Sequence, residues 1–322
     1  MQVIRAAEVE RETGALLELL GPQEPIDYEA LVASRAARAD PALAGRSEPI
    51  RLRAEVMLPL PESPIRVRVY RDGAGIATGP LLLWLHGGAF AGGSLDDIDV
   101  TCAGLARRSD LTVISLDYRL APEHPYPAAL HDTYDALAWL GEHGELFGGD
   151  GRLVAGGQSA GANLVAAACL LARDRGRSLV SRQVLCYPWL DFGFDSESHR
   201  LFDTVLSSRA DDRWFETQYL AGQEVTGYVV PLRAVDLAGL PPALILGAGL
   251  DPLRDDARRY AQRLTEHDVV VHYLEYASTP HAFLNFPGVL SAAWRAMQDI
   301  ADDLAGFLGL GPVLAEPERV EN

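Results

Sequence analysis

The stretch LVAGGQSAGANL, residues Leu153 to Leu164, carries the strongest structural signal in the sequence. Its apolar start predicts a buried strand, and the Ala- and Leu-rich run from Ala160 predicts a helix. Between them, Gly157-Gln158-Ser159-Ala160-Gly161 matches the G-x-S-x-G pattern. A serine on so sharp a turn takes strained backbone angles, and flanking glycines leave its hydroxyl uncrowded. We therefore predict that Ser159 is a nucleophile, against the alternative of a glycine-rich turn that happens to contain serine.

Composition limits the class of protein. The chain has 322 residues, 48% of them hydrophobic, which is enough for one large α/β domain or two smaller ones. No apolar run approaches the ~20 residues of a membrane helix, and residues 1–8 contain no apolar leader segment, so we expect a cytoplasmic protein. An odd number of cysteines without close spacing argues against a disulfide framework or a zinc site. Three core thiols are expected: Cys102, Cys169 and Cys186.

Net charge disfavours some partners, and the absence of lysine excludes some mechanisms. The net charge of −17 disfavours nucleic acids and anionic membranes as partners. All 28 basic residues are arginines, because the sequence contains no lysine. Schiff-base chemistry, a Ser-Lys dyad and a Walker A phosphate loop are therefore excluded on this chain. Any base that activates Ser159 must be a histidine.

The order of apolar segments predicts the architecture. The first ~45 residues have helical periodicity, and residues 50–60 and 65–71 alternate apolar and charged residues, as in an antiparallel pair at a sheet edge. Further strands are continuously apolar and alternate with helices, which indicates a mainly parallel sheet covered on both faces. These strands are expected at residues 81–85, 112–116, 153–155, 184–186, 243–246 and 269–274.

A second glycine-rich segment follows the strand at residues 81–85. It runs from His86 through Gly87, Gly88 and Ala89 to Ser94. Backbone so rich in glycine can bring several N–H groups close to a ligand, as an oxyanion hole requires. Gly88 and Ala89 are the candidate donors, with Ala160 as a third at the start of the predicted helix. The alternative is a flexible connection; His86 is expected to pin the loop rather than transfer protons.

Three motifs together carry a family resemblance: His86–Phe90, Asp117-Tyr118-Arg119-Leu120-Ala121-Pro122-Glu123, and Gly157–Gly161. In order and spacing, residues 81–307 resemble the hormone-sensitive-lipase-like family of α/β-hydrolases, also called bacterial family IV esterases. The resemblance implies an eight-stranded α/β-hydrolase sheet, a helical cap and serine carboxylesterase activity, without a metal or cofactor. The expected segments are an N-terminal cap (1–45), the core (46–190 and 231–310), a cap insertion (191–230) and an acidic tail (311–322).

The family order of serine, aspartate and histidine can be followed along the chain. Asp251 comes directly after a predicted strand, at the carboxyl edge of the sheet where α/β sites are built. Asp255 and Asp256 are interpreted as solvated acids in the first turn of the next helix. His281, in a loop after a later strand, resembles the catalytic histidine of the family, whereas His199 is expected at the surface. In this scheme neutral His281 takes the proton of Ser159 and Asp251 orients the imidazole.

Three residues depart from the family pattern. Gln158 stands where the family usually has aspartate, which keeps hydrogen-bonding capacity but removes a charge. Ala89 replaces the third glycine of the oxyanion loop and cannot adopt a positive φ cheaply. Ala282 follows the histidine where glycine is usual, and Pro280 precedes it. We expect an altered hydrogen-bond network near Ser159 and a differently set histidine loop.

The cap insertion is expected to contribute the substrate pocket. Apolar residues recur at helical spacing in residues 214–220, as in a helix with one face on the sheet. Candidate substrate contacts are Phe90, Tyr187, Trp189 and Trp214, which would favour a modest apolar group. The predicted function is hydrolysis of small-molecule esters with short-to-medium acyl chains by a protein that could form a homodimer. A deacetylase, amidase, lactonase or acyl transferase acting on a biosynthetic intermediate, or a non-catalytic ligand-binding homologue, remains as an alternative.

Overall fold

The computed structural model describes residues 2–4, 7–21, 24–37, 40–73, 78–203, 205–206 and 208–310. The predicted acidic tail, residues 311–322, lies outside these ranges. The strands are β1 (Gln2–Ile4), β2 (Leu52–Leu58), β3 (Ile65–Arg71), β4 (Gly79–Leu85), β5 (Thr112–Leu116), β6 (Gly149–Gln158), β7 (Arg182–Cys186), β8 (Ala243–Leu250) and β9 (Val271–Pro280). The α-helices are α1 (Ala7–Leu20), α2 (Tyr28–Ala36), α3 (Pro41–Ala44), α4 (Asp99–Ser109), α5 (Ala128–His143), α6 (Ala160–Asp174), α7 (Glu197–Leu201), α8 (Arg209–Leu220), α9 (Arg254–Glu266) and α10 (Ser291–Leu308), and the 3₁₀ turns are η1 (Gly144–Phe147), η2 (Pro231–Arg233) and η3 (Phe283–Asn285).

All described strands form one sheet in the order β1-β9-β8-β7-β6-β4-β5-β3-β2, so β6 is the central strand. The pairs from β1 to β5 along this order are parallel, whereas β3 pairs antiparallel with both β5 and β2. The predicted parallel sheet and its antiparallel edge are therefore confirmed. The implied count of eight strands is wrong, because β1 adds a ninth beside β9, with Gln2 opposite Leu274. A segment of three residues is too short to show a strand periodicity in the sequence.

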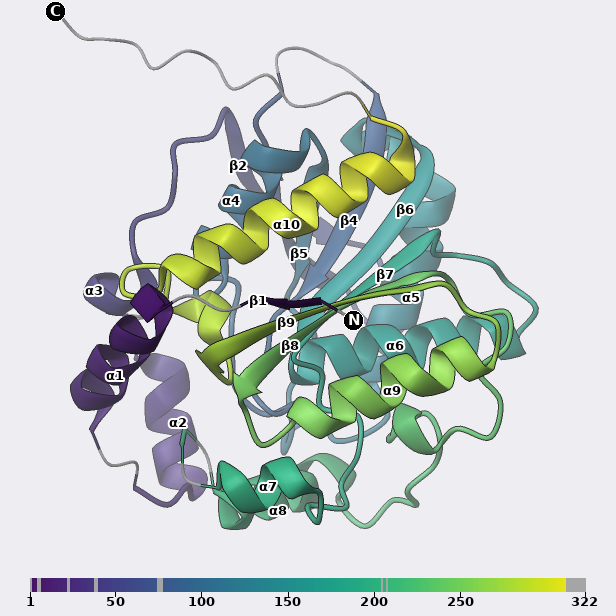
Figure 1. Ribbon diagram of the computed structural model, residues 1–322. Helices are drawn as coiled ribbons and strands as arrows, with labels where there is room; N and C mark the ends of the chain where they lie inside the picture. The colour runs from purple at the N-terminus through teal and green to yellow at the C-terminus, as the bar shows by residue number, and fades with distance from the viewer. Residues whose placement is uncertain are drawn as a thin grey trace, which may run out of the picture.

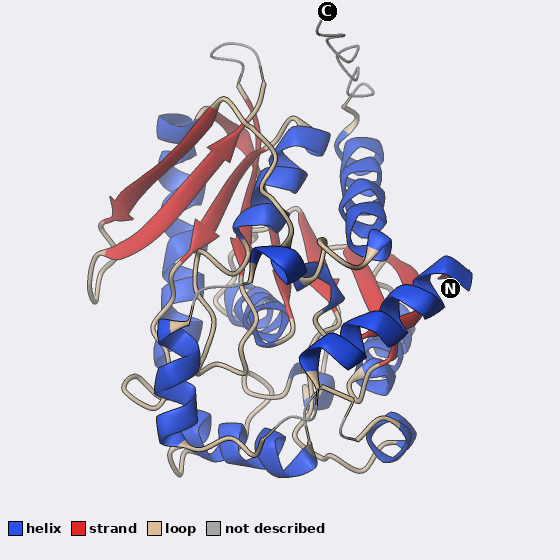
Figure 2. Ribbon diagram, turned by 90° about the vertical axis from the view of Figure 1, so that its left-hand side faces the viewer, coloured by secondary structure: helices blue, strands red, loops and turns tan. Residues whose placement is uncertain are grey.

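Helices cover both faces of this sheet (Figures 1 and 2). Helices α5, α6 and α9 bury apolar side chains against one face, and α4 and α10 do so against the other. The three cysteines are buried free thiols, as predicted. Within the described ranges, no helix is long and apolar enough to cross a bilayer.

The helices of the two predicted cap segments lie beyond the carboxyl ends of the strands. In Figure 1, α1 and α2 lie near the arrowheads of β8 and β9, and α7 and α8 lie below them. The two segments are bonded to each other, because the amide of Ile26 donates to the carboxylate of Asp211 at 2.9 Å. Both segments lie at the end of the sheet where Ser159 follows the central strand β6.

Candidate active site

Ser159 is the single residue between β6 and α6, and its backbone is strained as the sequence predicted, with φ 53° and ψ −117°. The flanking glycines are needed for close packing of strand and helix. A Cβ on Gly161 would lie 2.3 Å from the carbonyl oxygen of His86, and one on Gly157 would lie 2.7 Å from the carbonyl carbon of Gly161. The glycines thus let α6 begin directly against β4 and β6, which holds the serine at the edge of the sheet.

Two further predicted residues lie within hydrogen-bond distance of this serine or of each other. His281 Nε2 is 2.9 Å from Ser159 Oγ, and its Nδ1 is 2.8 Å from Asp251 Oδ2. The other oxygen of Asp251 accepts a bond from the amide of Leu253 at 2.8 Å. With Nδ1–H donating to Asp251, Nε2 is left as the acceptor for the serine hydroxyl. The structure therefore brings the three predicted residues together from the ends of β6, β8 and β9.

The surroundings of His281 shift its affinity for a proton. Burial by itself lowers the pKa of the imidazole, because it disfavours the charged form. The carboxylate of Asp251, by its charge and hydrogen bond, and that of Asp212 on α8 act in the opposite direction, and the net result is a pKa above the ordinary value. His281 therefore holds a proton more readily than an exposed histidine does.

The loop after β4 brings unbonded amides close to Ser159. Gly88, Ala89 and Phe90 all have positive φ angles, of 119°, 53° and 63°. A Cβ on Gly88 would lie 2.2 Å from the carbonyl oxygen of Gly92, so only glycine fits there. Ala89 adopts the left-handed conformation in place of the usual glycine, at a cost of about 1–2 kcal/mol. Within the described chain, the amides of Gly88 and Ala89 donate to no acceptor and are free for a ligand.

His86 holds this loop in place. Its ring is buried, stacks on Tyr118 at 4.2 Å and has Nδ1 at 2.7 Å from the carbonyl oxygen of Gly87. The hydroxyl of Tyr118 donates to the carbonyl oxygen of His86 at 2.9 Å. Burial lowers the pKa of His86, which keeps the ring neutral. These contacts agree with a structural role for this histidine.

A cavity of about 300 Å³ lies over Ser159 and His281. Two of the four predicted contact residues, Tyr187 and Trp189, line it. Phe90 and Trp214 are not among its lining residues; Phe90 is fully buried and stacks on Tyr219 at 3.9 Å. Phe90 adopts its positive φ in the loop that also contains Gly88 and Ala89.

Sequence reasoning missed several lining residues from the two cap segments. They are Leu31 and Ser34 on α2 and Asp212 and Phe215 on α8. Asn285 in η3, which belongs to the core, also lines the cavity. The apolar pattern of α8 was a usable signal for Phe215, since it directly follows the predicted Trp214. The helical periodicity of residues 1–45 does not mark Leu31 or Ser34 as lining residues, because their contact with the cavity depends on how α2 docks.

Two surface predictions are wrong. Asp256 is only 1% exposed, and its carboxylate accepts a bond from the amide of Asp191 at 3.1 Å. His199 is also 1% exposed, with Nδ1 at 2.7 Å from Ser196 Oγ. The reason is the same in both cases: the segment after β7 folds over the start of α9. The amide of Ser198 accordingly donates to Asp255 at 2.9 Å.

Asp117 and Arg119, which follow β5, are both held in ion pairs. Arg119 donates through Nη2 to buried Asp132 at 2.6 Å and to Glu62 at 2.7 Å. Asp117 pairs with Arg66 at 2.9 Å. These bonds fix the loop next to the segment of His86 and Gly88.

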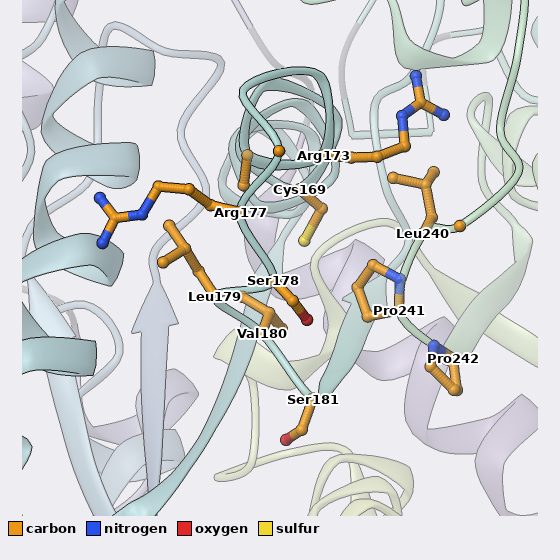
Figure 3. A pocket seen from close by; sticks show the side chains of 13 residues that line it. Cys169, Arg173, Arg177, Ser178, Leu179, Val180, Ser181, Leu240, Pro241 and Pro242 are labelled. Atoms are coloured by element: carbon orange, nitrogen blue, oxygen red, sulfur yellow. The ribbon is translucent and has the colours of Figure 1, made fainter.

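A second cavity, of about 440 Å³, lies at the other end of the sheet, between the end of α6 and the loops before β7 and β8 (Figure 3). The guanidinium groups of Arg173 and Arg177 point away from its centre in this view. Arg173 bonds the carbonyl oxygens of Asp236 and Ala238, and Arg177 bonds Glu142. Across the residues that the structure describes, no group of three or more His, Cys, Asp or Glu side chains is arranged to hold a metal ion.

Comparison with known proteins agrees with this geometry. Residues 82–285 match a family described as having the alpha/beta hydrolase fold. The carboxylic ester hydrolase LipN of Mycobacterium tuberculosis is 43% identical over 72% of this chain, and the match spans 64% of LipN. The esterase LipI of the same organism is 38% identical over 73% of this chain and 76% of its own length. The structure of an esterase from Pyrobaculum calidifontis superposes with a TM-score of 0.84 at 35% identity, covering 91% of this chain and 97% of that one.

Proposed function

The chain belongs to the hormone-sensitive-lipase-like family of α/β-hydrolases, and from this membership we infer that it hydrolyses carboxylic esters with Ser159 as the nucleophile. The observation that carries the proposal is the hydrogen-bonded series from Ser159 through His281 to Asp251 beneath a cavity. A serine hydroxyl is a weak nucleophile unless an adjacent base takes its proton. His281 Nε2 is 2.9 Å from the hydroxyl oxygen, within reach for that transfer.

The reaction then proceeds in two halves. Ser159 Oγ attacks the ester carbonyl carbon while His281 takes its proton, which gives a tetrahedral oxyanion. His281 returns the proton to the leaving alcohol as the carbon–oxygen bond breaks, leaving an acyl-serine. Water next attacks the acyl carbon, with His281 again as base, and the acid leaves as Ser159 is regenerated. Asp251 stays ionised throughout and stabilises the imidazolium.

The oxyanion would be stabilised by backbone amides. We assign this role to Gly88, Ala89 and Ala160. The positive φ angles of Gly88 and Ala89, and the position of Ala160 at the start of α6, support the assignment. Each such donor typically contributes about 3 kcal/mol to transition-state stabilisation.

The cavity size supports small substrates. Its volume of about 300 Å³ is at the lower end of ligand pockets, and Leu31, Trp189 and Phe215 supply apolar walls. We therefore propose esters with short-to-medium acyl chains. The homodimer, the cytoplasmic location and the transferase or amidase alternatives stay predictions from the sequence.

The test compares wild type with Ser159→Ala on p-nitrophenyl esters of increasing acyl length, with mass spectrometry of the trapped acyl-enzyme. We expect turnover and an acyl adduct in wild type, both lost in the variant. Ser178→Ala, in the second cavity, is the matched control and should retain both. Wild type that neither turns over nor becomes acylated would refute the proposal.

A further inference from the structure

Tyr187 and Gln158 form a buried contact directly beside the catalytic serine. Gln158 is the last residue of β6, opposite Cys186 at the end of β7, and Tyr187 follows Cys186. The hydroxyl of Tyr187 donates to Oε1 of Gln158 at 2.8 Å, and both residues are 1% exposed. Burial raises the pKa of Tyr187 well above its ordinary value, so the pair is neutral. Two adjacent strand ends are thereby joined by a side-chain bond immediately next to Ser159.

The ring of Tyr187 contacts the catalytic histidine and its loop. Its centroid is 5.2 Å from that of His281, and the two planes meet at 71°. On the same ring, Phe283 packs edge-on at 5.4 Å. Phe283 is fully buried and lies two residues after His281. Aromatic rings in such tilted contacts attract each other beyond simple burial, so Tyr187 restrains both the imidazole and the loop that carries it.

The side-chain amide of Gln158 makes one hydrogen bond among the described residues, the one from Tyr187. Its Nε2 is buried and has no hydrogen-bond partner among the described residues. The bond from Tyr187 is thus what orients the amide, and the phenol is held both by this amide and by a backbone hydrogen bond with Leu284. Backbone strain adds to the constraint, because Tyr187 has a φ of 37° and its amide donates to the carbonyl oxygen of Leu246 at 2.6 Å.

We propose that Tyr187 and Gln158 act as one unit that positions His281 between Ser159 and Asp251. Asp251 holds the imidazole at Nδ1, and the Tyr187 ring, fixed by Gln158, supports one side of it. The inference rests on the proposed function, in which His281 is the base. Glutamine suits this position because its amide accepts the phenol bond without adding a charge.

Charge matters here because two carboxylates already act on His281. Asp251 faces it from the end of β8 and Asp212 from α8. Tyr187, whose ring also contacts His281, contributes no charge. If the ring is released, the imidazole loses part of its alignment with Asp251, and the pKa of His281 falls toward its ordinary value. A merely structural role for Tyr187 would leave this pKa unchanged.

The experiment is a double-mutant cycle in the full chain with Tyr187→Phe, Gln158→Met and the double variant. Each single change should lower kcat for p-nitrophenyl acetate about fivefold, the effect of one hydrogen bond, with KM within about twofold. The double variant should be no slower than the slower single variant, because both changes break the same bond. The acid limb of the pH profile should move to lower pH in all three.

Controls separate this role from general stability. Tyr260→Phe removes another buried phenol hydroxyl, on α9 and away from the site, and should change neither kcat nor the acid limb. Should Gln158→Met not fold, Tyr187→Leu serves instead, because it removes the ring and should reduce kcat more than Tyr187→Phe does.

Additive losses in the double variant, or full kcat in Tyr187→Phe, would overturn the proposal. If wild type shows no esterase turnover, the proposed function has failed, but the pair can still be tested. Titration of the His281 imidazole by NMR needs no substrate. A lower His281 pKa in Tyr187→Phe than in wild type supports the pair, and an equal pKa overturns it.

Discussion

The guanidinium of Arg35 on α2 donates through Nε to the carbonyl oxygen of Ala91, at 2.6 Å, in the loop that contains Gly88 and Ala89. The same group donates to the carbonyl oxygen of Ala121, and its Nη1 pairs with Glu123 at 2.9 Å. Leu31 of this helix lines the cavity over Ser159 and His281. One side chain thus joins a wall of the cavity over Ser159 to the loop of the proposed oxyanion donors.

Arg35→Ala is expected to lower kcat/KM about tenfold, because the loop and the cavity wall both lose their anchor, equivalent to about 1.4 kcal/mol of transition-state stabilisation. Arg35→Lys should remain impaired, since an ammonium can pair with Glu123 but lacks the planar fork that spans two carbonyl oxygens. Steady-state kinetics measures both. Arg295→Ala, an exposed arginine on α10, is the control, and equal kcat/KM in Arg35→Ala and this control would contradict the expectation.

The pH dependence of kcat/KM should follow the raised pKa of His281. Only neutral His281 can accept the serine proton, so kcat/KM should rise as pH increases through its pKa. Because that pKa is raised, the midpoint should lie above ~6.5. Asp251→Asn should remove the main cause of the shift, moving the midpoint down, and should lower kcat by about 10⁴. A pH series from 5 to 9 with chemistry limiting measures the midpoint, and a flat profile between pH 5.5 and 7.5 would exclude His281 as the base.

The contribution of Asp256 to the free energy of unfolding should decrease as pH rises. Burial and the nearby Asp191 raise the pKa of Asp256 well above its ordinary value, so the folded state binds its proton more tightly than the unfolded state. Stability from this group is fully present below about pH 4 and is lost as pH rises toward the folded pKa. In Asp256→Asn the side chain does not ionise in this pH range, and its amide oxygen can still accept the hydrogen bond from the amide of Asp191.

We therefore expect Asp256→Asn to increase the free energy of unfolding at pH 8 by at least about 1 kcal/mol, with the gain shrinking toward pH 4. Urea denaturation at several pH values measures this difference. Asp302→Asn, at an exposed position on α10, should show no such trend. A gain that does not depend on pH would mean that repacking, and not charge, is responsible.

Local chemistry explains what the sequence could predict. The turn at Ser159 needs glycines on both sides, and Gly157 and Gly161 supply a recognisable pattern. Asp251 and His281 are far apart in the sequence, but each follows a strand of a parallel sheet. Because parallel strands end at the same edge, topology predicts that residues following these strands lie near Ser159, and the family resemblance selects His281 among the eight histidines.

Tertiary docking explains what the sequence could not predict. Asp256 resembles a solvated acid in a first helical turn, and its burial comes from the segment around Asp191, which lies 65 positions away. Leu31 lines the cavity only because Arg35 fixes α2 against the loop of Ala91. Phe90 is adjacent to a proposed oxyanion donor, but it packs on Tyr219 instead of lining the cavity.

Gly161 provides a direct test of the packing that holds the turn at Ser159. Its missing Cβ would lie 2.3 Å from the carbonyl oxygen of His86 and 2.5 Å from that of Leu85, both of them backbone atoms that cannot rotate away. Gly161→Ala should therefore reduce the free energy of unfolding by about 2–3 kcal/mol. It should also reduce kcat, because α6 would have to move away from β4 and Ser159, at the start of α6, would move with it.

Gly306→Ala, also a helical glycine, has open space at the corresponding point and should instead increase stability by about 0.5–1 kcal/mol. Denaturant unfolding of both variants beside wild type measures the contrast. If Gly161→Ala were as stable and as active as wild type, close contact between α6 and β4 could not be what positions the serine.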